Sequence, residues 1–266
     1  MNIKHSRPHM GGMKTNLIFR RLFGDAFPSS SALAIDLCKR GEITQTSQLA
    51  HLGCGVGTVS SLISSHFSCA IMGVESISQL IEIANVECAN ELLKFECAPL
   101  HKTPFPSARY THILTEANLS VYRQPIRLLN EASRLLVNDG LLLNSEIVIT
   151  DVSRLDAKVS EFLTIALGDD STYTLDDWVS LLETSGFSVI QAQIEPSIMR
   201  SNGKKLRRAL FGVNLLRRTK QISFSELGLE ALEDDFDAIS KATLTAIDNG
   251  IITYASFISK PNNTRF

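Results

Sequence analysis

The chain has 266 residues, of which 44% are hydrophobic and 20% are charged, and its formal net charge is −2 at pH 7. This length can bury a sizeable core as one α/β domain or as a domain with a cap, and the composition is that of an ordinary globular protein. The near-neutral charge gives no reason to expect nucleic acid as a partner. No apolar run reaches the roughly 18 residues of a transmembrane segment. No signal-peptide pattern is visible, so we expect a cytoplasmic location.

The first 45 residues precede the first predicted strand. They contain a glycine-containing loop at 9–14, which leads into a helical pattern over 15–23, and a second helical pattern over 32–39. We therefore interpret residues 1–45 as an N-terminal helical arm.

Apolar strands alternate with amphipathic helices from residue 48 to about residue 196. This alternation indicates a parallel sheet with right-handed crossovers. Thr174 followed by Asp177 predicts a helix start, and Gly186 predicts the end of that helix. The predicted strands are 48–53, 69–75, 93–98, 110–117, 141–149 and 187–195, and the predicted helices are 57–66, 76–91, 122–137, 155–167 and 174–185.

A long connection separates the last two predicted strands. It contains a basic helical pattern over 204–220 and a helical pattern with an acidic centre over 224–248, before a final strand over 250–259. We expect residues 46–196 to form the core, 197–249 a helical cap insertion, and 250–266 the last strand and tail. The basic segment could bind an anionic substrate, a membrane surface or RNA, or could be a solvated helix face. Aromatic residues are not interleaved with its cations, which argues against stacking on RNA bases.

Three glycines at alternate positions follow the first predicted strand. Gly53, Gly55 and Gly57 would let the backbone turn sharply and let a ligand approach the main chain before the next helix. Glu75 ends the second predicted strand 18 residues after Gly57. A carboxylate at that position can accept both hydroxyls of a ribose, so the joint pattern predicts a site for a nucleotide-like cofactor.

These motifs resemble those of the class I S-adenosylmethionine-dependent methyltransferases, over about residues 48–189. In that family the glycine-rich motif bends around the methionine part of the cofactor, and an acid at the end of strand two holds the ribose. Gly53, Gly55, Gly57 and Glu75 match those positions. Further resembling blocks are 75–84 at the end of strand two, 103–106 before strand four, 116–120 after strand four, and 127–136 before strand five.

The resemblance implies a fold, a cofactor and a lid. The fold is a Rossmann-like, seven-stranded, mostly parallel sheet with helices on both faces and an antiparallel last strand, and the cofactor is S-adenosyl-L-methionine. Small-molecule members of the family fold N-terminal segments over the bound cofactor, so residues 1–45 are either such a lid or a plain helical arm.

The chain departs from the family pattern at several positions, so its first motif is degenerate. His51 stands where an Asp or Glu is usual, Pro99 where an acid near the adenine is usual, and Thr111 where an Asp is usual. The usual Pro-Gly-Gly before strand five is replaced by residues 138–140. Each lost charge-assisted hydrogen bond would cost roughly 1.5–3 kcal/mol, or about ten- to a hundredfold in affinity. His51 could compensate in part by contacting the cofactor carboxylate.

Methyl transfer from a sulfonium is an in-line displacement that needs alignment more than a catalytic base. Because ligands lie at the carboxyl ends of the strands of an open sheet, we expect Glu116 and Glu146 to be catalytic, with Asn118 nearby. The alternatives are that backbone amides bind Glu116 and that Glu146 points into solvent. The predicted cofactor-binding residues are His51, Gly53, Cys54, Gly55, Gly57, Glu75, Ser76, Pro99, Leu100 and Glu116.

All five cysteines lie in the first hundred residues and none forms a CxxC motif, which argues against a disulfide framework. The related arsenite methyltransferases use thiolates from both halves of the chain, and no cysteine follows Cys97 here. His9 and His101 lack the spacing of metal ligands, so we expect no metal site.

The favoured hypothesis is a cytoplasmic methyltransferase that acts on a small-molecule acceptor, without nucleic acid or a transmembrane segment. The alternative is a catalytically inactive methyltransferase-fold protein that binds or scaffolds, and a third possibility is action on RNA or protein. The sequence identifies neither the acceptor and its reacting atom nor the oligomeric state, because one fold hosts many chemistries.

Overall fold

The computed structural model describes residues 30–120, 122, 124–160, 163, 173–219, 223–224 and 233–262. The loop predicted at 9–14 and the helix predicted at 15–23 lie outside these residues, as do parts of the helices predicted at 155–167 and 224–248.

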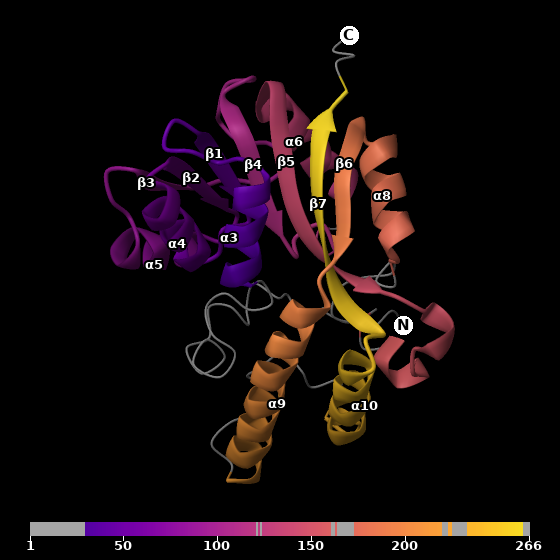
Figure 1. Ribbon diagram of the computed structural model, residues 1–266. Coiled ribbons are helices and arrows are strands. Elements are labelled where there is room, and N and C mark those ends of the chain that lie inside the picture. The colour runs from indigo at the N-terminus through magenta and orange to yellow at the C-terminus, as the bar shows by residue number, and fades with distance from the viewer. Residues whose placement is uncertain are drawn as a thin grey trace, which may run out of the picture.

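The described residues form a seven-stranded sheet in the order β3-β2-β1-β4-β5-β7-β6 (Figure 1). Neighbouring strands from β3 to β5 are parallel, whereas β7 runs antiparallel to both β5 and β6. The predicted Rossmann-like fold with an antiparallel last strand is therefore confirmed. The strands are β1 Gln48–Leu52, β2 Ala70–Glu75, β3 Leu93–Cys97, β4 Tyr110–Glu116, β5 Leu136–Ile149, β6 Phe187–Ile194 and β7 Ile252–Pro261.

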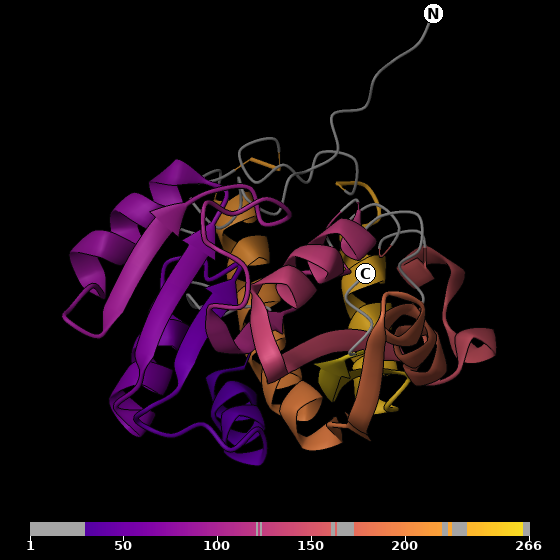
Figure 2. The same ribbon diagram turned by 90° about the horizontal axis from the view of Figure 1, so that it is seen from above.

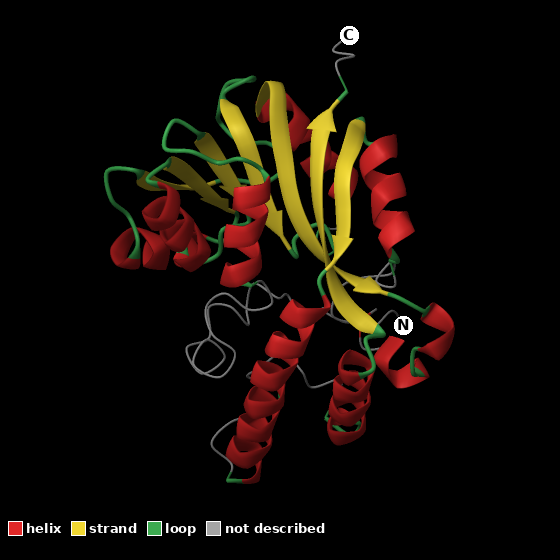
Figure 3. Cartoon of the chain, viewed as in Figure 1, coloured by secondary structure: helices red, strands yellow, loops and turns green. Residues whose placement is uncertain are grey.

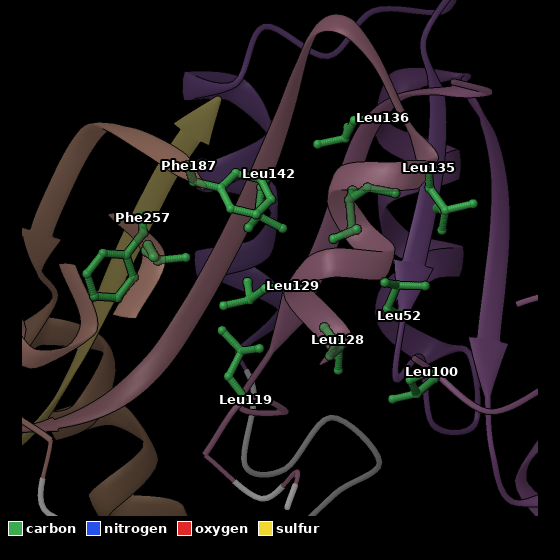
Figure 4. Packing of buried hydrophobic residues seen from close by; sticks show 14 of the residues in the cluster. Leu52, Leu100, Leu119, Leu128, Leu129, Leu135, Leu136, Leu142, Phe187 and Phe257 are labelled. Atoms are coloured by element: carbon green, nitrogen blue, oxygen red, sulfur yellow. The ribbon is translucent and has the colours of Figure 1, made fainter. Parts of the chain in front are cut away.

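Helices cover both faces of the sheet, as Figures 2 and 3 show. α3 (Ser31–Arg40), α4 (Thr58–Phe67) and α5 (Ser78–Glu87) pack on one face. α6 (Pro125–Leu135) and α8 (Leu175–Thr184) pack on the other. Successive strand side chains point to opposite faces, so the two sides of the sheet form separate clusters. Figure 4 shows leucines of α6 packed with Leu52 of β1, Leu142 of β5 and Phe257 of β7.

Two further helices lie at the edge of the sheet where the parallel strands end. α9 (Pro196–Arg218) directly follows β6, and α10 (Phe236–Asp248) directly precedes the antiparallel β7, so both start or finish at this carboxyl edge (Figure 1). α9 begins eight residues before the predicted 204, because Pro196 suits the first turn of a helix. The helices predicted for the cap are thus present, while their role as a cap stays a prediction. None of the described helices combines the length and apolar character needed to cross a membrane.

Several predicted boundaries were wrong, each for a local reason. α5 ends at Glu87 instead of 91, because the Asn90 side chain accepts hydrogen bonds from the amides of Leu92 and Leu93. β5 begins at Leu136 instead of 141, because Leu136 pairs with Tyr110 before the register shifts. The helix start at Thr174 is confirmed by a capping box with Asp177.

Candidate active site

The glycine-rich turn after β1 follows from the backbone conformation that its glycines allow. Gly53, Gly55 and Gly57 have φ values of 81°, 57° and 82°, a region that L residues adopt only with strain. The amides of Gly53 and Cys54 donate to the Val74 carbonyl at 2.8 and 3.1 Å. These bonds place the turn beside the end of β2, which is where Glu75 lies.

The space around the three glycines differs. A Cβ on Gly53 would lie 2.2 Å from Asn118 Nδ2, and a Cβ on Gly57 would lie 2.5 Å from Phe95 Cζ. A Cβ on Gly55 would meet no atom of the described part of the chain within 4 Å. Packing therefore requires glycine at 53 and 57, whereas Gly55 faces open space that a ligand can occupy.

Glu75 points at this turn, and its carboxylate is buried with 6% of the residue exposed. Its Oε1 accepts hydrogen bonds from Ser76 N at 2.7 Å, Ser76 Oγ at 3.1 Å and Ile77 N at 3.3 Å. Its Oε2 accepts one from Gly55 N at 3.3 Å. A carboxylate oxygen has two lone pairs, so Oε2 keeps capacity for a hydroxyl donor beside the open space at Gly55. This arrangement fits a ribose.

The other residues near the turn that were predicted to bind the cofactor differ in their surroundings. Ser76 orients Glu75 through two hydrogen bonds. The side chain of Cys54 is buried in the cluster on the face covered by α3, α4 and α5, and that of Leu100 in the cluster on the opposite face. Pro99 is exposed after β3. Direct contact of these residues with a cofactor stays a prediction.

His51 and Glu116 are brought together beneath the turn. They lie on neighbouring strands, β1 and β4, and His51 Nε2 is 3.6 Å from Glu116 Oε2. His51 Nδ1 is 2.8 Å from Ser60 Oγ of α4, and His51 and Glu116 are only 2% and 3% exposed. The sequence did not single out Ser60, because its only signal is one serine in the helix after the glycines. Contact of His51 or Glu116 with cofactor or acceptor stays a prediction.

Glu146 holds the β4 exit, which is the segment 117–120 after β4. It is 0% exposed, its Oε1 accepts from Leu119 N at 3.0 Å, and its Oε2 accepts from Ser120 N at 3.3 Å. Burial raises the pKa of Glu146 to about 7. The alternative that Glu146 points into solvent was wrong, because β5 lies between β4 and β7 with both of its faces covered. Its predicted catalytic role is still untested.

Asn118 connects the β4 exit to the glycine turn. Its Nδ2 donates to the carbonyls of Leu52, Gly53 and Glu116 at 3.2, 3.4 and 3.0 Å. Phe95 of β3, which the sequence did not single out, supports the turn by packing beside Gly57 and Gly73. The Asn118 side chain therefore couples the glycine turn to the ends of β1 and β4, and the Phe95 side chain couples the turn to β3.

The cysteines and potential metal ligands form no second centre among the described residues. Burial raises the pKa values of the Cys38 and Cys69 thiols, which disfavours the reactive thiolate. Within the described ranges, no group of three or more His, Cys, Asp or Glu side chains could hold a metal ion. His9, one of the histidines considered above, lies outside these ranges.

The central part of the chain is similar to a known family of protein domains. Residues 50–144 match a family model described as a methyltransferase domain. This segment runs from β1 into β5 and includes the glycine turn, Glu75 and Glu116. No curated protein sequence matches the chain.

Solved structures with the same fold include the [4+2]-cyclase SpnF, at a TM-score of 0.71 and 14% identity, covering 98% of this chain and 97% of that chain. Another is the Haemonchus contortus phosphoethanolamine N-methyltransferase 2 with phosphomonomethylethanolamine and S-adenosylhomocysteine, at 0.69 and 14%, covering 92% and 56%. A third is the Streptomyces coelicolor geranyl diphosphate C-methyltransferase with Mg²⁺, geranyl diphosphate and S-adenosyl-L-homocysteine, at 0.65 and 13%, covering 91% and 82%. Residues 50–144 are therefore similar to a methyltransferase domain, and the chain has the class I S-adenosylmethionine-dependent methyltransferase fold.

Proposed function

We propose that this protein binds S-adenosyl-L-methionine and transfers its methyl group to a small-molecule acceptor. The observation that carries the proposal is the Glu75 carboxylate, whose Oε2 faces Gly55 at the carboxyl edge of the sheet, next to open space. Support comes from the methyltransferase domain over 50–144 and from neighbours solved with S-adenosylhomocysteine.

Each part of the site has a physical role in this proposal. The bound cofactor supplies a methyl group already activated by its sulfonium. Glu75 Oε2 accepts the ribose hydroxyls, and the methionine part lies along the open face of Gly55. Glu146 keeps the β4 exit in place through two amides, so the acceptor is aligned by a held backbone. We place Glu116, at the end of β4, near the acceptor.

The departures from the family pattern raise the alternative that the protein has the methyltransferase fold but no catalytic activity. Thr111 Oγ1 accepts a hydrogen bond from Gln48 N at 3.0 Å, so this side chain ties β4 to the start of β1, at the end of the strands opposite the glycine turn. Among the described residues, no side chain fills the space at Gly55 in place of a ligand, since none of their atoms lies within 4 Å of a Cβ placed there. These contacts favour a site that binds cofactor. The similarity to a [4+2]-cyclase shows that this fold also hosts a different reaction, so transfer itself must be measured.

Titration calorimetry with S-adenosylmethionine and S-adenosylhomocysteine tests the proposed binding. Glu75→Gln should weaken binding about ten- to a hundredfold, because one charge-assisted acceptor is lost. Glu82→Gln, on the exposed side of α5, is the matched control and should bind as the unchanged protein does. Absence of binding at millimolar cofactor would refute the cofactor assignment.

A second assay tests catalysis separately. The protein is incubated with methyl-labelled cofactor and a panel of small molecules carrying oxygen, nitrogen, sulfur and carbon nucleophiles, and S-adenosylhomocysteine formation is measured. Acceptor-dependent product that Glu75→Gln reduces supports the methyltransferase. Tight cofactor binding without transfer to any acceptor class would favour a non-methyltransferase use of the same site.

A further inference from the structure

One face of α9 carries a continuous stripe of cationic and apolar side chains. The α9 stripe consists of Lys204, Arg208, Phe211, Leu215 and Arg218. Their spacings alternate between four and three residues, so at 3.6 residues per turn they lie within an arc of about 80°. Phe211 is 72% exposed and Leu215 is 53% exposed, and all three cations are exposed.

The opposite face of α9 already packs against the protein. Asn202, Ala209 and Val213 are buried there, and Val213 packs with Phe224 and Phe236. The exposed apolar pair is therefore the outer face of a packed helix. Figure 1 shows α9 projecting together with α10 beyond the carboxyl edge of the sheet.

The cationic side chains of α9 also fall into two groups, one paired with α10 and one facing outward. Arg207 pairs with Asp248 at 2.8 Å, and Arg217 approaches Asp237 at 3.8 Å, so two cations attach α9 to α10. The three cations of the stripe form no ion pair with any residue in the described part of the chain. Two exposed apolar side chains are thus flanked by three cations that face outward.

The combination of cationic and apolar side chains in the α9 stripe favours one class of binding partner. A second copy docked face to face would bring the cations of one stripe against those of the other, which is unfavourable. A nucleic acid would gain only one aromatic for base stacking. An anionic bilayer offers phosphates for the cations and acyl chains for the apolar pair, as interfacial amphipathic helices use them. We propose that the α9 stripe docks the protein on an anionic lipid surface.

Vesicle flotation with the full chain tests this proposal. The protein is mixed at low salt with phosphatidylcholine vesicles or with vesicles of three parts phosphatidylcholine and one part phosphatidylglycerol. Binding should occur to the anionic vesicles and fall with added salt. Phe211→Gln with Leu215→Gln, and separately Lys204→Gln with Arg208→Gln and Arg218→Gln, should each lower the partition coefficient at least tenfold.

Matched controls remove similar side chains from other exposed positions. Val86→Gln with Ile126→Gln, at 87% and 53% exposure, and Lys39→Gln with Lys94→Gln and Lys102→Gln, should bind vesicles as the unchanged protein does. Glu75→Gln should also bind normally, because lipid docking is independent of the proposed cofactor site. Equal binding by stripe and control variants, or no binding to anionic vesicles, would overturn the proposal. So would binding to single-stranded RNA alone, or a dimer that Phe211→Gln with Leu215→Gln dissociates.

Discussion

The glycine turn after β1 and the polar interior beneath the β4 exit use similar residue types in opposite ways. At the turn, Glu75 Oε2 accepts a hydrogen bond from one donor among the described residues, Gly55 N, and faces the open space at Gly55. In the interior, both oxygens of Glu146 accept backbone amides and none of the residue is exposed. Glu116 is likewise buried, next to His51. The carboxylate at the turn has acceptor capacity directed at open space, while that of Glu146 is used by backbone amides inside the protein.

The difference shows how this fold separates ligand binding from ligand positioning. An acceptor atom beside open space can exchange a protein contact for a ligand contact at little cost. A fully buried carboxylate cannot, because breaking its bonds leaves buried polar groups unsatisfied. We therefore expect substitutions of Glu75 and Gly55, which border the open space, to lower cofactor affinity, and substitution of the buried Glu146 to change stability.

The largest effect should come from glycine substitutions within the turn itself. Gly57→Ala should lower the free energy of unfolding by about 3–5 kcal/mol, since it combines left-handed strain with overlap on the Phe95 ring. Gly55→Ala should cost only about 1–2 kcal/mol, from strain alone, yet should weaken cofactor binding. Denaturant unfolding and calorimetry measure the two quantities. Equal stability losses at both positions would contradict the packing difference.

Glu146 should make stability depend on pH. Its pKa is about 7 in the folded protein against an ordinary 4.5, so the unfolded chain loses this proton first as pH rises. The free energy of unfolding should therefore fall by about 3 kcal/mol between pH 4.5 and 7, with no further fall from this group above pH 7. Glu146→Gln should remove this slope, whereas Glu183→Gln, on the exposed side of α8, should retain it. Parallel slopes in all three proteins would rule out the assignment.

The smallest expected effect is the coupling between His51 and Glu116. A double-mutant cycle with His51→Asn and Glu116→Gln should give a coupling of about 1–2 kcal/mol in the free energy of unfolding, because the two side chains are in contact. His51→Asn with Glu146→Gln is the control, since Glu146 is bound on the other face of the sheet by the β4 exit. Coupling should there stay within about 0.5 kcal/mol. A coupling free energy of zero between His51 and Glu116 would show that these two side chains contribute to stability independently.

Much of the fold could be predicted from local patterns. Strand and helix alternation follows from hydrophobic periodicity, and the turn follows from glycines whose left-handed φ values other residues adopt only with strain. The early start of β5 could not be predicted, because Leu136 is held as a strand by pairing with Tyr110, 26 residues earlier. The basic pattern at 204–220 indicated a helix, but only packing on α10 separated the cations that pair inward from those of the stripe.

The sequence by itself determined the order of elements, the turn and the placing of an acid at the end of β2, because each is a property of a few adjacent residues. Only the tertiary structure decided that Gly55 faces space while Gly57 faces Phe95. It also decided that Glu146 is buried and that His51 lies against Glu116. These outcomes depend on strand register and on helices packed from distant parts of the chain, which no local pattern encodes.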